Sequence, residues 1–116
     1  MEKINKGYVL AIISVDDPEV FKQYVARTPH AVEKFRGTFL SRGTDYTIHE
    51  GGSDPARIVL LEFESYKVAK DFYESPEYQE AANFRRKSAA THFFILNGYD
   101  HSLAAIVPGG LKEKGD

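Results

Sequence analysis

Three segments of the sequence carry apolar residues on both faces of a predicted β-strand: residues 7–15 (GYVLAIISV), 56–63 (ARIVLLEF) and 91–97 (THFFILN). Successive side chains of a strand point to opposite faces of its sheet. A sheet with one face in water therefore alternates apolar and polar residues, and these segments do not. We predict a sheet that is covered on both faces, because a large exposed apolar face is a liability in water.

A helical pattern follows the first strand. Asp17 and Pro18 suit the cap and the first turn of a helix, and apolar residues continue at helical spacing as far as Phe35. Pro29 removes a backbone donor inside this pattern, so we expect a kink there or two short helices. Gly37 is the expected stop.

The rest of the chain contains a hairpin and a second helical region. Residues 38–42 and 45–50 are predicted to form one strand with a bulge at Gly43. The turn at 51–55 then makes a hairpin with the strand at 56–63. A helical pattern starts at Ser65, and a second start signal, Ser-Pro-Glu, predicts a break or kink at residue 75.

The predicted order of elements is strand, helix, strand, strand, helix, strand. This order is typical of the ferredoxin-like βαββαβ arrangement, an α+β fold with one antiparallel sheet and its helices on one face. A doubly wound sheet is the alternative, and the central hairpin disfavours it. We expect a single domain over residues 1–99 and a C-terminal tail over 100–116 that is partly mobile.

The face of the sheet away from the helices needs its own cover. The same face of a second chain would provide it, which predicts a two-fold homodimer through the sheet. The alternative is the short apolar patch at 103–107, which could cover the face within one chain or add a strand across the dimer.

The composition excludes several classes of function. The 116 residues carry a net charge of -2, which argues against nucleic-acid binding through bulk electrostatics and against a polybasic membrane anchor. The chain has no cysteine, so disulfides and thiolate metal sites are excluded. The four histidines lack metal-ligand spacing, and we expect neither a metal nor another cofactor. No long apolar run or signal-peptide pattern is present, so we expect a cytoplasmic location.

Several motifs match a known family: Lys6-Gly7-Tyr8, Asp17-Pro18, Tyr24, Phe39-Leu40-Ser41-Arg42-Gly43, Glu50-Gly51, Glu62-Phe63, Ala69, Phe72-Tyr73, Ser75-Pro76-Glu77-Tyr78 and Arg85. Over about residues 6–99 the chain resembles the domain-of-unknown-function 1330 family, a bacterial group in the dimeric α+β barrel superfamily. Pro29 and the tail beyond Tyr99 depart from the family pattern. The resemblance implies the same fold and a sheet-to-sheet dimer. It implies no single activity, because the superfamily includes cofactor-independent monooxygenases, isomerases, haem-dependent enzymes and ligand-sensing domains.

Four residues are candidates for binding a small molecule. Arg42 lies in a strand beside Gly43 and could hold an anion through its paired donors, or form a salt bridge at an edge or interface. Arg85 falls on the inward stripe of its helix, where it needs a carboxylate of the protein or of a ligand. Tyr24 and Tyr78 also lie on inward stripes, where their hydroxyls could line a pocket or be satisfied within the core.

Two residues are candidates for catalysis. Glu62 lies on an otherwise apolar strand face, which fits a general base or a buried ion pair with Arg42 or Arg85. His92, in the last strand, is the best single candidate for a proton carrier or a haem ligand, and a surface histidine is the alternative.

Two kinds of function fit these residues. The first is a module that binds or senses a small anionic or aromatic metabolite between the sheet and the helices. The alternative is a cofactor-independent monooxygenase or isomerase acting on a small organic acid or phenol. In that case the arginines would hold the anion, and Glu62 or a tyrosine would move a proton. The sequence alone favours neither.

Overall fold

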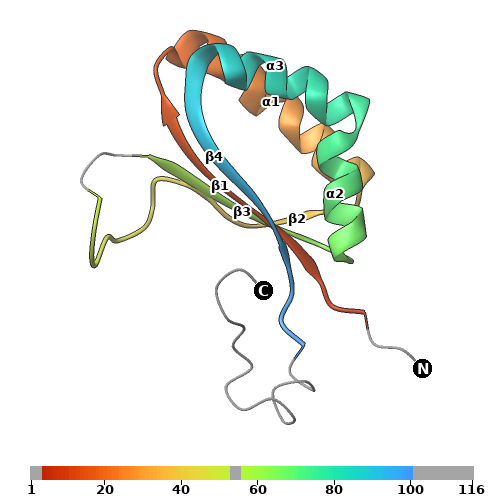
Figure 1. Cartoon of the computed structure of the whole chain (residues 1–116). Coiled ribbons are helices and arrows are strands. Elements are labelled where there is room, and N and C mark those ends of the chain that lie inside the picture. The colour runs from red at the N-terminus through yellow and green to blue at the C-terminus, as the bar shows by residue number, and fades with distance from the viewer. Residues whose placement is uncertain (1–3, 53–55, 101–116) are drawn as a thin grey trace.

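The computed structural model of the chain describes residues 4–52 and 56–100. Its elements are β1 (Gly7–Val15), α1 (Pro18–Lys34), β2 (Thr38–Gly43), β3 (Arg57–Phe63), α2 (Tyr66–Glu74), α3 (Pro76–Ser88) and β4 (Ala89–Asn97). The strands form an antiparallel sheet in the order β2-β3-β1-β4, and α1, α2 and α3 lie on one face of it (Figure 1). The ferredoxin-like α+β fold is confirmed. The apolar patch at 103–107 lies outside the described residues.

The core lies between the sheet and the helices. It combines the inward side chains of β1 and β3 with an aromatic layer from the helices: Val9, Ala11, Ile13, Leu61 and Phe63, with Phe21, Tyr24, Phe72 and Tyr78. The ring of Phe72 lies 4.8 Å from that of Phe63 and 4.7 Å from that of Tyr78, measured between centroids. Ring contacts therefore join the sheet to two of the helices.

The other face of the sheet is apolar and carries no helix in the part of the chain that the structure describes (Figure 1). At its centre Leu10 of β1 lies between Leu60 of β3 and Phe94 of β4. Phe94 and Leu96 are 47% and 42% exposed. The sheet therefore carries apolar residues on both faces, as the sequence predicts, and the helices cover one of the two faces. We call this surface the open face.

Helix α1 ends one residue earlier than the sequence pattern indicates. Arg36 takes the left-handed conformation, with φ of 58°. The N–H of Gly37 donates to the carbonyl of Val32 at 2.9 Å, which completes the turn that ends the helix. Gly37 has a steric role, because a Cβ there would lie 2.6 Å from the ring of Phe63.

Two further predictions about the helices can be checked. Helix α1 runs unbroken through Pro29, so the alternative of two short helices is wrong. The break at Ser75 is confirmed, because this residue ends α2 and caps α3 by accepting a hydrogen bond from the N–H of Tyr78 at 3.1 Å. In the described ranges no helix has the length and apolar character needed to cross a membrane.

The strand predicted at 45–50 is wrong. Gly43 ends β2 with φ of 117°, and it lies opposite Ile58, the second residue of β3. Because β3 begins only at Arg57, residues 45–50 have no neighbouring strand with which to pair in the described part of the chain. They form part of the connection between β2 and β3 instead.

Candidate functional site

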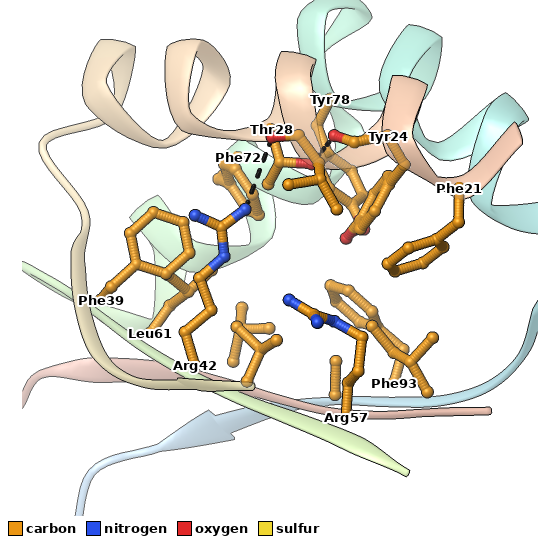
Figure 2. A pocket seen from close by; sticks show the side chains of 15 residues that line it. Phe21, Tyr24, Thr28, Phe39, Arg42, Arg57, Leu61, Phe72, Tyr78 and Phe93 are labelled. Carbon is orange, nitrogen blue, oxygen red and sulfur yellow. Dashed lines mark hydrogen bonds between the residues drawn. The ribbon is translucent and has the colours of Figure 1, made fainter. Parts of the chain in front are cut away.

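A cavity lies between the helix-facing side of the sheet and α1. Its wall is mostly apolar and includes the aromatic rings of Phe21, Tyr24, Phe39, Phe72, Tyr78 and Phe93. Arg42 and Arg57 rise from the sheet toward α1 and complete the lining (Figure 2). The space open to the centres of water molecules is about 20 Å³, and the empty space out to the mouth is about 390 Å³. The closed cavity thus has room for a water molecule or two.

The position of Arg42 depends on an irregularity in β2. The register against β3 shifts between Phe39 and Ser41, so Leu40 is the extra residue of a bulge. Residues three apart in a regular strand point to opposite faces. The bulge brings both Phe39 and Arg42 to the helix-facing side, where the guanidinium carbon lies 4.5 Å from the ring centroid. The bulge predicted at Gly43 lies at Leu40, and it brings Arg42 into the cavity.

Pro29 supplies Arg42 with a hydrogen-bond acceptor. In a regular α-helix the N–H of residue 29 would bond to the carbonyl of Val25, and proline has no N–H. The Val25 carbonyl is therefore free to accept another donor, and Arg42 Nη2 donates to it at 3.5 Å. This long contact joins β2 to α1 across the cavity. Pro29, which departs from the family pattern, thus frees the carbonyl to which Arg42 donates at the cavity.

We expect Pro29→Ala to raise the free energy of unfolding by about 2 kcal/mol, because an exposed interior proline costs a helix hydrogen bond. The restored N–H would compete with Arg42 for the Val25 carbonyl. Arg42→Met should therefore cost less stability in the Pro29→Ala background than in the wild type, as measured by urea unfolding. Pro76→Ala is the control, since Pro76 occupies the first turn of α3, where no helix bond is lost. A fall in stability for Pro29→Ala would contradict this interpretation.

Arg57 was not among the predicted site residues. It shares its strand face with Val59 and Leu61, and an arginine on that buried face is the signal that could have found it. Its guanidinium carbon lies 5.6 Å from the ring centroid of Phe21. Burial, and then the positive charge of Arg57, lower the pKa of Arg42. Neither arginine takes part in the ion pairs of the described residues, so within that part of the chain the two positive charges at the cavity have no counter-charge.

Tyr24 and Tyr78 form the buried end of the cavity, where their hydroxyl oxygens lie 2.8 Å apart. Burial raises the pKa of Tyr78 well above its ordinary value. Arg85 lies behind this pair, with its guanidinium carbon 5.8 Å from the ring centroid of Tyr24 and 5.5 Å from that of Phe93. Burial acts to lower the pKa of Arg85, but attraction to the phenol oxygens outweighs burial and raises it.

The four predicted ligand-binding residues, Tyr24, Arg42, Tyr78 and Arg85, are therefore brought together around one cavity. Arg85 differs from the others in lying behind the lining rather than in it. Their hydroxyls and guanidiniums provide donors at both the mouth and the buried end of an apolar space. Such an arrangement can bind and orient a small molecule that has polar groups at its ends.

Glu62 and His92 lie elsewhere. Glu62 is opposite Tyr8 on the open face, and His92 is exposed on the same face. The sheet separates both from the cavity. The expected ion pair of Glu62 with Arg42 or Arg85 is absent from the described residues. Within those residues, no group of three histidine, aspartate or glutamate side chains is placed to hold a metal ion.

A second hollow, of about 440 Å³, adjoins the cavity on the surface. Phe21, Val25 and Arg57 line both spaces. These shared side chains are the partition between them. Rotation of Phe21 and Arg57 about their side-chain bonds would join the spaces, and such rotamer changes are common when proteins bind ligands.

The antiparallel sheet with helices on one face and a cavity between them defines the class of this protein, which is that of the ferredoxin-like α+β proteins. Within that class the chain belongs to the family described as "Domain of unknown function (DUF1330)", whose model matches residues 6–99. The family expected from the motifs is therefore confirmed. No curated protein matches the chain.

Solved structures share this fold at low sequence identity. A protein of unknown function from Rhodopseudomonas palustris has a TM-score of 0.69 and 14% identity, over 84% of this chain and 85% of its own. SnoaB, a cofactor-independent oxygenase from Streptomyces nogalater, has a TM-score of 0.59 and 13% identity, over 83% and 95%. A dimeric protein of unknown function and ferredoxin-like fold from Bacteroides fragilis has 0.56 and 10%, over 79% and 95%. These likenesses show the fold alone.

Proposed function

We propose that the cavity binds a small organic acid with a planar, apolar body. One observation carries this proposal: Arg42 and Arg57 converge on an aromatic-lined cavity and form no ion pair among the described residues. A carboxylate between them would accept charge-assisted hydrogen bonds from two guanidiniums. The rings of the wall would contact the body of the ligand.

The size of the ligand depends on the partition formed by Phe21 and Arg57. With the partition closed, the inner cavity holds water alone, whereas the two hollows joined together lie within the usual volume range of a small-molecule pocket. We propose that the acid enters from the outer hollow and that Arg57 turns to meet its carboxylate. The ring of Phe21 would then pack against the bound ligand.

A cofactor-independent oxygenase or isomerase is the second candidate. The hydrogen-bonded pair of Tyr24 and Tyr78 favours it, because phenol groups at the buried end could give a proton to a bound ring. SnoaB, which shares the fold, is a cofactor-independent oxygenase. Glu62 and His92 take no part in this version of the proposal, since they lie across the sheet from the cavity.

We also propose that a second copy of the chain covers the open face. Leu10, Leu60, Phe94 and Leu96 give this face an apolar centre that is costly to leave in water. When two copies pair through this face, each copy covers the apolar surface of the other, and the contact is a closed two-fold interface. The Bacteroides fragilis protein, which shares the fold, is dimeric.

Calorimetric titration with benzoate and with benzamide tests the ligand proposal. The two molecules have nearly the same shape, and only benzoate carries a charge. We expect benzoate to bind at least about tenfold more tightly, and its affinity to fall as salt is added. Equal affinities, or no binding of either, would contradict the proposal. Oxygen consumption with 4-hydroxybenzoate under air would favour the oxygenase over a binding protein.

A further inference from the structure

Arg85 is a buried cation without a counter-charge among the residues that the structure describes. Its exposure is 6%, and its Nε is buried and makes no hydrogen bond. None of the ion pairs of the described residues includes it. The rings of Tyr24 and Phe93 offset part of the cost of burying this charge, but they leave the charge itself unneutralised. A negative charge near the buried end of the cavity would neutralise the charge of Arg85.

The phenol pair between Arg85 and the cavity has a donor to spare. Two hydroxyl groups carry two protons, and the contact of 2.8 Å between Tyr24 and Tyr78 uses one of them. The other proton remains available to a ligand oxygen. Burial keeps the Tyr78 hydroxyl protonated, so it serves as a donor and not as a second negative charge. A positive charge behind such a chain of hydroxyls strengthens the last donor in it.

The geometry points to a second anion site: the buried end of the cavity binds an ionised oxygen on the ligand. This inference rests on the proposed function and deepens it, because it specifies the class of acid. The ligand is a planar acid with its carboxylate between Arg42 and Arg57 and a phenolate or enolate oxygen at the opposite end. The phenol pair donates to that oxygen, and Arg85 supplies the balancing charge.

This assignment separates related acids from one another. A ring acid without the second oxygen leaves the spare donor without a partner, which costs affinity inside a dry cavity. A ring acid with an amine at the same end would place a positive charge against Arg85, and the site would reject it. We therefore expect 4-hydroxybenzoate to bind more tightly than benzoate, and 4-aminomethylbenzoate more weakly.

The state of the second oxygen can be read directly with 4-hydroxy-3-nitrobenzoate, whose phenolate absorbs visible light. Its phenol is titrated free and when bound to the whole protein. We expect the bound pKa to lie at least about one unit lower, which means that the phenolate binds at least about tenfold more tightly than the phenol. Tyr24→Phe keeps the ring and removes one of the two hydroxyls, and it should reduce this shift. The matched probe, 3-nitrobenzoate, lacks the hydroxyl, so Tyr24→Phe should weaken its binding much less than it weakens that of the hydroxylated probe.

The outcomes distinguish the two proposals. If 3-nitrobenzoate binds but the phenol of the hydroxylated probe titrates as it does in water, the second anion site is overturned and the proposed function stands. A lowered pKa that survives in both Tyr24→Phe and Arg85→Gln overturns the roles given to these residues. If neither probe binds, both proposals fall together.

Discussion

Replacing Arg42 and Arg57 together with methionine is expected to weaken benzoate binding by about 30- to 1,000-fold. Two lost charge-assisted hydrogen bonds correspond to about 2–4 kcal/mol of binding free energy, allowing for the open side of the cavity. Methionine keeps the length and apolar character of the arginine stem, so the wall of the cavity stays filled. Calorimetric titration of wild type and variant with benzoate measures the change.

The same double variant should remain folded. Burial, and then the positive charge of Arg57, lower the pKa of Arg42, and neither guanidinium has an ion-pair partner among the described residues, so the fold loses little with them. Arg86→Met combined with Lys87→Met is the matched control, because it removes two exposed positive charges from α3 outside the cavity. If the control weakens benzoate binding equally, the effect belongs to net charge and the site is wrongly assigned.

The fold could be predicted because its signals are local. The capping residues Asp17 and Ser75 mark helix starts that the structure confirms. The one wrong strand, at 45–50, failed for a non-local reason: the segment needed a neighbouring strand, and β3 begins too late to provide one. Strand propensity is weak evidence without knowledge of the partner.

The site was harder to predict because both faces of the sheet are apolar. When apolar residues occupy both alternating positions, the sequence cannot say which face the helices cover. The sequence therefore permits an ion pair of Glu62 with Arg42 or Arg85, although the sheet lies between Glu62 and the cavity. The bulge at Leu40 adds to the difficulty, since one extra residue changes the face to which Arg42 points. Arg85 and the two tyrosines escaped this ambiguity because helical periodicity places them directly.

Phe94→Lys is expected to convert the proposed dimer into a monomer. The side chain is 47% exposed in the single chain, so lysine is tolerated there before assembly. In a two-fold dimer the change occurs twice at one interface, and each lysine would be buried without a partner. A cost of several kcal/mol for each unpaired charge should weaken association by at least about 1,000-fold. Size-exclusion chromatography with light scattering over a range of concentrations measures it.

Ile48→Lys is the matched control, because Ile48 is 51% exposed and lies in the connection after β2, outside the sheet. A wild-type protein that is already monomeric would contradict the dimer and would mean that the open face is covered within one chain. The monomeric Phe94→Lys variant should still bind benzoate, because the cavity is lined from the helix-facing side of the sheet. Since Phe93 lines the cavity and Phe94 faces the open side, loss of benzoate binding would instead show that pairing of the sheets holds β4 in the position the ligand needs.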